Sequence, residues 1–130
     1  EIGGQGAADA LAHLPVDTAI AVDIAPAAAE YGTENSANPI LIEKDGRGVY
    51  HAATNRQLET LARAGGFDVQ KAVVTSYASD SSISRAYGHV ARAALIGYPG
   101  DNTHGYEICS RDGIVNTTRL LLAYLLNPVS

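Results

Sequence analysis

Short apolar runs alternate with helical patterns along most of the chain. Runs that are apolar or rich in β-branched residues predict strands at residues 18–23, 39–45, 69–77 and 89–98. Longer stretches with helix-favouring residues, capping residues or glycine stops predict helices at residues 3–14, 53–65, 79–88 and 112–126. This alternation is typical of an α/β fold with three layers, in which helices cover both faces of a largely parallel sheet.

The ends of the predicted helices carry capping signals. Thr54 or Asn55 is expected to cap the start of the helix at 53–65, and Gly65 its end. Asp80 is expected to cap the short helix at 79–88. Residues 24–38 have the composition of a loop with at most a turn of helix.

Composition indicates one globular domain. Of the 130 residues, 46% are apolar and 18% charged, which is a folded composition of single-domain length. A net charge of −5 with nine scattered Lys and Arg residues argues against nucleic acid as a partner. No apolar run approaches the roughly 20 residues of a membrane helix, so no membrane partner is expected. The single cysteine excludes an internal disulfide and favours a reducing compartment such as the cytoplasm.

The start of the chain is unusual. There is no methionine anywhere, and Glu1 leads directly into a glycine-rich turn. We therefore expect this chain to be part of a longer protein whose front is missing.

Two residues stand where ligands collect in open α/β sheets, beyond the carboxyl ends of strands. Asp23 ends the first predicted strand, and His104 lies in the glycine-rich loop after the last one. Glu1 would be a third if a strand precedes it. Two carboxylates and an imidazole suit a divalent metal such as zinc, which activates water for amide hydrolysis. Spacing alone leaves plainer roles open: Asp23 could cap a turn, and His104 could be a loop histidine satisfied by the backbone.

Four segments, taken in order, resemble the co-catalytic metallo-aminopeptidase family that includes the TET peptidases and glutamyl aminopeptidases, some of whose members have been labelled endoglucanases. The segments are "EIGGQGA" at 1–7, "AIAVDIAP" around Asp23, "SYASDSS" around Asp80, and "PGDNTHGYE" with His104 and Glu107. The resemblance covers residues 1–127, and it implies that this chain is the C-terminal portion of a catalytic domain.

The resemblance also implies roles for individual residues. Glu1 and His104 would bind one of two divalent ions, zinc or cobalt, and Asp23 the other. Asp80 would lie near the site. Separately from the resemblance, a histidine that binds a metal usually donates its other N–H to a carboxylate or carbonyl, so Glu107 is expected to orient the imidazole. The family's first histidine, its bridging aspartate and its general-base glutamate would all lie upstream, so the isolated chain is expected to be inactive. The intact protein would cleave N-terminal residues from peptides and form a homo-oligomer.

Two other functions remain open from the sequence. The chain could be a non-catalytic α/β binding or assembly module derived from that family. A carbohydrate-active enzyme would need two carboxyl groups flanking a sugar, for which Asp23 and Glu107 are the available pair.

Overall fold

The computed structural model describes residues 3–127 of the chain. The helices are α1 (Gln5–His13), α2 (Ala52–Ala64), α3 (Asp80–Ala86) and α4 (Arg111–Leu126), with a 3-10 turn η1 (Ala29–Tyr31). The strands are β1 (Thr18–Pro26), β2 (Ile40–Asp45), β3 (Gly48–Val49), β4 (Gln70–Val73), β5 (Arg92–Asp101) and β6 (Ile108–Cys109). None of these helices is long and apolar enough to cross a bilayer.

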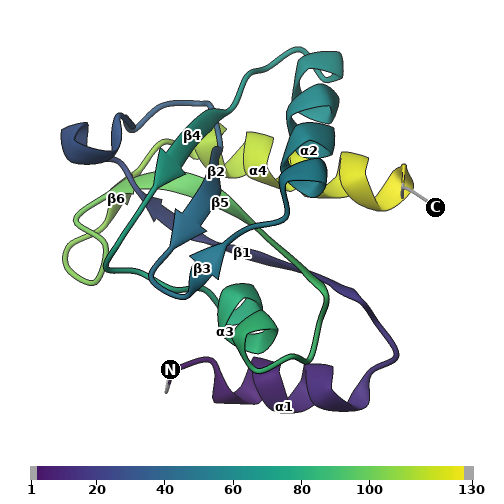
Figure 1. Cartoon of the computed structure of the whole chain (residues 1–130). Helices are drawn as coiled ribbons and strands as arrows, with labels where there is room; N and C mark the ends of the chain where they lie inside the picture. Colours follow the sequence, from purple (N-terminus) through teal and green to yellow (C-terminus); the bar gives the residue numbers. More distant parts are fainter. Residues whose placement is uncertain (1–2, 128–130) are drawn as a thin grey trace.

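The strands form one mixed sheet in the order β1-β5-β2-β3, with β4 paired to β2 and β6 paired to β5. Its two longest ladders, β1 with β5 and β2 with β4, are parallel. The pairings of β2 with β5, β2 with β3, and β5 with β6 are short and antiparallel. Figure 1 shows α1 and α3 packed together on one side of this sheet and α2 and α4 away from them. The predicted α/β class, with helices on both faces, is confirmed.

The central strands are apolar because both of their faces are covered. Along β2, Ile40 and Ile42 belong to the cluster that also contains Val74 and Leu95, whereas Leu41 belongs to the cluster with α2 and α4. Side chains of a strand alternate between faces, so a strand buried on both sides shows a continuous apolar run. The second cluster consists of buried residues from β2, β5 and two helices: Leu41, Leu58, Ala62, Ala94, Ile96 and Leu120.

Two of the predicted helix caps are wrong. The N-cap of α2 is His51, whose ring nitrogen accepts a hydrogen bond from the backbone N–H of Thr54. Asn55 is buried instead and donates to the carbonyl of Ile42. The N-cap of α3 is Ser79, which forms a reciprocal capping box with Ser82, so Asp80 is the first residue inside the helix.

The two strands that carry the candidate site end later in the sequence than predicted. β1 continues to Pro26 and β5 to Asp101, because the two strands pair with each other over these additional residues. Asp23 therefore lies within β1, opposite Gly97, and does not end the strand. The two-residue strands β3 and β6 were not predicted, because segments so short show no hydrophobic period.

A close contact between β1 and β5 requires a glycine. A Cβ atom added to Gly97 would lie 2.2 Å from the Cβ of Ala25 and 3.3 Å from its Cα. Ala25 itself is fully buried, so it has no room to move away. Glycine at position 97 lets the two strands pair at the level of Asp23.

Replacing Gly97 with Ala is expected to lower the free energy of unfolding by about 1–3 kcal/mol or more, as overpacking of a filled core does. The matched control is Gly6→Ala in α1, where nothing lies within 4 Å of the new Cβ. That change should leave stability unaltered or raise it by up to about 1 kcal/mol, since alanine favours helix. Urea denaturation of both variants measures the difference. Equal effects of the two changes would contradict the close approach.

Candidate functional site

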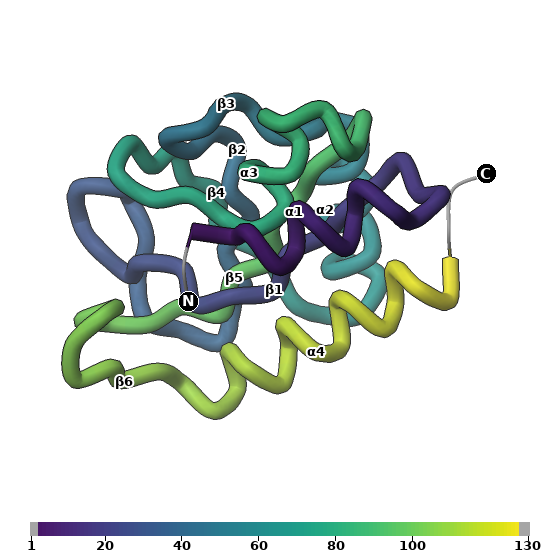
Figure 2. Tube along the Cα trace, turned by 90° about the horizontal axis from the view of Figure 1, so that it is seen from below, coloured from purple at the N-terminus to yellow at the C-terminus, as the bar shows by residue number. Residues whose placement is uncertain are grey.

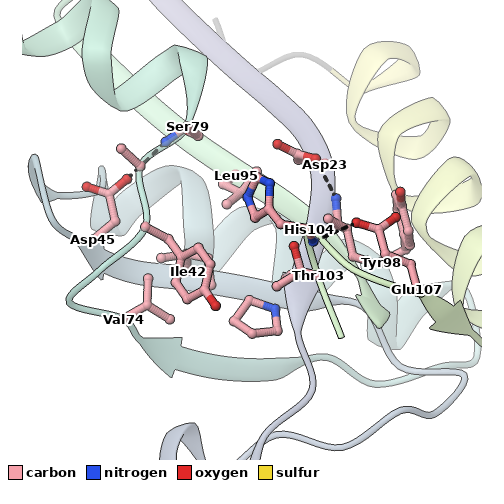
Figure 3. Close-up of a pocket in the computed structure, with 15 residues that line it drawn as sticks. Asp23, Ile42, Asp45, Val74, Ser79, Leu95, Tyr98, Thr103, His104 and Glu107 are labelled. Atoms are coloured by element: carbon pink, nitrogen blue, oxygen red, sulfur yellow. Dashed lines mark hydrogen bonds between the residues drawn. The ribbon is translucent and has the colours of Figure 1, made fainter. Parts of the chain in front are cut away.

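A cavity of about 190 Å³ opens at the carboxyl ends of β1 and β5. The exposed side chains of Asp23, His104 and Glu107 line its rim. The buried side chains of its floor are Ala25, Ile42, Asp45, Val74, Ser79 and Leu95. Figure 3 shows Asp23, Tyr98 and Glu107 on one side of the pocket, Asp45, Ser79 and Val74 on the other, and His104 between them. The cavity thus runs from a polar, exposed rim to a largely apolar floor.

The parallel pairing of β1 and β5 brings two of the predicted ligands to this cavity. Pro26 at the end of β1 pairs with Gly100 near the end of β5, so both strands leave the sheet at the same end. Figure 2 shows the chain after β5 turning at that end before it enters β6. Asp23 from β1 and His104 from this turn line the same cavity although 81 positions separate them in the sequence.

The turn that carries His104 holds an uncommon backbone conformation. Asn102 and His104 have φ angles of 56° and 65°, and Gly105 donates its N–H to the carbonyl of Asn102 over 2.8 Å. A positive φ is uncommon for residues other than glycine, and Asn and His are among those that tolerate it best. Such conformations cluster at functional sites, where surrounding structure maintains them.

The side chain of Glu107 contacts the backbone of His104. The Glu107 carboxylate accepts a hydrogen bond from the backbone N–H of His104 at 3.1 Å (Figure 3). The sequence interpretation had this carboxylate orienting the imidazole ring. In the structure it holds the turn on which the ring is mounted.

The other two predicted site residues are placed differently. Glu1 lies outside the described residues. Asp80 does not line the cavity with His104; it lines a neighbouring groove between α1 and β1, of about 490 Å³. Asp23 lines both the cavity and the groove, so it lies on the boundary between them.

The described residues supply an incomplete but chemically suitable set of metal donors. Within residues 3–127, no three His, Cys, Asp or Glu side chains gather closely enough to hold an ion. Asp23 and His104 offer a carboxylate and an imidazole, both common zinc ligands, at the rim of one cavity. One oxygen of Asp23 accepts from the N–H of Ile24 at 2.7 Å, which orients the carboxylate. These two residues fit a metal as part of a larger donor set.

The rim has a negative electrostatic character. Burial raises the pKa of the Tyr98 hydroxyl, and the negative charges of Glu107 and Asp23 raise it further. Tyr98 therefore stays neutral at physiological pH. The described residues that line the cavity include no lysine and no arginine to offset these carboxylates.

A buried polar network lies under the floor. The Asp45 carboxylate, 2% exposed, accepts hydrogen bonds from the hydroxyl of Tyr50 at 2.6 Å and from the N–H groups of Arg47, Gly48 and Ser79. Four donors around one carboxylate satisfy it without a cation. Tyr50 also contacts the Ser79 hydroxyl at 2.7 Å, which connects the β2–β3 turn to the start of α3.

This network was not predicted from the sequence, although a signal for it was present. Asp45 is followed by Gly46, and Asp-Gly after a strand predicts a tight hairpin. An aspartate at that position commonly accepts from backbone N–H groups of its own turn, as Asp45 does. Nothing in the sequence indicated the contact with Tyr50.

Comparison with known proteins settles the family. A family model described as M42 glutamyl aminopeptidase matches residues 1–120. The chain belongs to this M42 family.

One curated relative and several solved structures resemble this M42 chain. YhfE of Bacillus subtilis (strain 168), named as a candidate aminopeptidase, is 28% identical over 119 residues, which cover 90% of this chain and 34% of that protein. The chain therefore spans about a third of the length of this relative.

The solved structures share the fold. The TET1 peptidase of Pyrococcus horikoshii, whose report describes assembly into a tetrahedron or a large octahedral shell, matches with a TM-score of 0.81 at 19% identity over 94% of this chain and 37% of that one. A TET aminopeptidase of Thaumarchaeota archaeon SCGC AB-539-E09 matches with a TM-score of 0.87 at 16% identity, covering 98% and 38% of the two chains. Aminopeptidase APDkam598 of Desulfurococcus kamchatkensis matches with a TM-score of 0.84 at 23% identity, covering 95% and 37%.

Replacing Tyr50 with Phe should lower the free energy of unfolding by about 1–3 kcal/mol at neutral pH, because Asp45 loses a buried donor. Tyr106→Phe is the matched control, since that side chain is 85% exposed. Thermal or urea unfolding of the two variants gives the comparison. A Tyr50 variant as stable as the control would show that the network contributes nothing.

The same residue predicts a dependence on pH. Burial, followed by the hydrogen bond to Asp45, raises the pKa of the Tyr50 hydroxyl well above its ordinary value. Because this pKa is higher in the folded than in the unfolded protein, the Tyr50 hydroxyl stays protonated to a higher pH in the native state. Its contribution to stability is therefore complete below about pH 10 and is lost as pH rises above that value. The stability difference between the parent chain and the Tyr50→Phe variant should shrink over that range. A difference that stays constant to pH 11 would contradict the prediction.

Proposed function

We propose that this chain is the C-terminal portion of the catalytic domain of a dinuclear metallo-aminopeptidase, which removes N-terminal residues from peptides. The observation that carries the proposal is the meeting of Asp23 and His104 at the rim of one cavity, across the β1–β5 ladder. Membership of the M42 family supports the activity. We further propose that the intact protein forms a homo-oligomer, as the assembly described for the similar TET1 peptidase suggests. We place it in the cytoplasm because its single cysteine favours a reducing compartment.

In this proposal, two divalent ions, zinc or cobalt, are held jointly by this chain and by residues outside it. Glu1 and His104 hold one ion, and Asp23 the other. A bound divalent ion supplies a water made nucleophilic near neutral pH. The part of this chain is to fix the imidazole and the carboxylate: Glu107 holds the backbone of His104, and the N–H of Ile24 orients Asp23. The general base is expected upstream of Glu1.

An open sheet edge supports the view that further polypeptide completes the domain. Within the described residues, β1 has a hydrogen-bonded neighbour only on its β5 side. Its nine residues carry a single charge, at Asp23, and the side chain of Val22 is 47% exposed. Natural proteins rarely leave a long apolar edge strand uncovered. The groove between β1 and α1 adds a second uncovered apolar surface beside it.

The direct test is an aminopeptidase assay on the intact protein with zinc or cobalt. Asp23→Ala and His104→Ala should each reduce kcat/KM by more than the roughly 10–100-fold loss that follows from changing residues around metal ligands. Asp9→Ala and His13→Ala are matched controls on the exposed surface of α1, and they should retain full activity. The isolated chain of residues 1–130 should show no turnover. Chelator-sensitive turnover by the isolated chain, or full activity of both site variants, would refute the proposal.

Glu107 provides a separate test of how the ligand is positioned. Glu107→Ala should weaken zinc binding by the intact protein by about 10–100-fold. Glu107→Gln should restore most of the affinity, because an amide oxygen still accepts from the N–H of His104. Glu30→Ala, at an exposed position in η1, serves as the control. Calorimetric titration with zinc measures all three. Equal affinity of the Ala variant and the control would remove Glu107 from the site.

A further inference from the structure

The turn that carries His104 has few supports of its own. Most of residues 102–108 are exposed, and β6 pairs with β5 over only two residue pairs. Inside the turn, one hydrogen bond links Gly105 to Asn102 and another links His104 to Glu107. Exposed segments with so few contacts open easily. The position of the imidazole therefore depends on what holds the base of the turn.

The side chain of Asn35, from the loop after η1, holds both ends of this turn. Its amide nitrogen donates to a carboxylate oxygen of Asp101 and to the carbonyl of Ile108, each over 2.9 Å. Its amide oxygen accepts from the backbone N–H of Ser110, also over 2.9 Å. Asp101 is the last residue of β5, Ile108 is the first residue of β6, and Ser110 is the N-cap of α4. Asn35 therefore ties together the two strands on either side of the turn and the helix that follows them.

These three hydrogen bonds require the amide group of an asparagine. The amide offers two N–H donors and an oxygen acceptor, and each of them meets a group of the complementary kind. A carboxylate at position 35 would face the carboxylate of Asp101 and the carbonyl of Ile108, and an aliphatic side chain would form none of the three bonds. Among residues 3–127, no other side chain from outside residues 101–110 hydrogen-bonds to that segment.

The backbone around Asn35 is itself held by the body of the protein. Gln70, the first residue of β4, accepts from the N–H of Glu34 at 2.8 Å and donates to the carbonyls of Glu34 and Asn38 at 3.0 and 2.9 Å. From the other side, Asn116 of α4 donates to a third carbonyl of the same segment over 2.9 Å. Contacts of this kind fix a supporting residue on rigid elements. Asn35 thus connects the His104 turn to β4 and α4.

We propose that Asn35 is a positioning residue of the metal site, which fixes the turn under His104 without contacting the metal or the substrate. Asn35 does not line the cavity, so its effect passes through the two ends of the turn. Site residues need to be held within about 0.5 Å of their productive geometry, and groups that support metal ligands commonly change affinity by about 10–100-fold. This inference rests on the function proposed above.

Calorimetric titration of the intact protein with zinc separates positioning from a general loss of fold. Asn35→Ala should weaken binding of the ion that His104 holds by about tenfold or more, and it should weaken the ion that Asp23 holds less. His104→Ala identifies which of the two binding steps belongs to the first ion. A general loss of folded protein would reduce the number of both sites alike.

Asn127→Ala is the matched control. It removes a hydrogen bond of the same kind, from an asparagine amide to the carbonyl of Ala123 over 2.9 Å, at an exposed position outside the turn. Both zinc affinities of this variant should equal those of the parent protein. Equal weakening of the two ions by Asn35→Ala, or equal behaviour of Asn35→Ala and the control, would overturn the inference.

An exchange of two side chains tests the hydrogen bond itself. Asn35→Asp should weaken zinc at the His104 site at least as much as Asn35→Ala, because two carboxylates then face each other. Adding Asp101→Asn restores an amide opposite a carboxylate with the roles reversed. The double variant should therefore recover part of the affinity lost in Asn35→Asp, and Asp101→Asn alone completes the cycle. Losses that simply add in the double variant would contradict the inference.

Hydrogen–deuterium exchange of the metal-free intact protein provides a readout that needs neither zinc nor turnover. Asn35→Ala should speed exchange of the backbone amides of residues 102–109 by about fivefold or more, the scale of one lost hydrogen bond, and leave β1 unchanged. Unchanged exchange in the turn, or equally faster exchange throughout the protein, would overturn the inference. Absence of zinc binding by the parent protein would instead refute the function proposed above, and exchange in the turn would still decide whether Asn35 holds it.

Discussion

The parallel ladder between β1 and β5 is the constraint on which the rest of the structure depends. It runs in one register from Thr18 opposite Arg92 to Pro26 opposite Gly100. That register places Asp23 and the turn that follows β5 at the same end of the sheet. It is possible only because Gly97 leaves room for the side chain of Ala25. A larger residue at that position would separate the strands where the candidate site begins.

Much of the architecture could be predicted from the sequence, because the strongest signals were local. The apolar faces of the helices and the strand-like runs placed every long element, and helices on both faces of the sheet followed from their alternation. The errors fell where tertiary pairing decides. β1 and β5 extend beyond their apolar runs because each supplies hydrogen-bonding partners to the other. His51 caps α2 although neither its residue type nor its position was an obvious signal.

Some features of the candidate site could be predicted from the sequence, whereas others depend on tertiary structure. Asp23 and His104 could be named because strand ends in α/β folds collect ligands, and the family resemblance singled out the same residues. The contact of Glu107 with the backbone of His104 depends on the φ angles of the turn, which no sequence pattern encodes. The Asp45–Tyr50–Ser79 network joins the β2–β3 hairpin to Ser79, which lies 29 positions beyond Tyr50, so only the folded structure shows it. Asp80 lies in the neighbouring groove because Ser79 takes the capping position.

Asp23 and His104 are expected, above all, to act at one metal centre. Diffraction from crystals of the intact protein grown with zinc, recorded at the zinc absorption edge, tests this most directly. Two anomalous peaks about 3.5–4 Å apart are predicted, as in other two-metal sites, with a His104 ring nitrogen and an Asp23 oxygen each about 2.0–2.2 Å from one of them. Zinc bound elsewhere, with neither side chain in contact with it, would contradict the account.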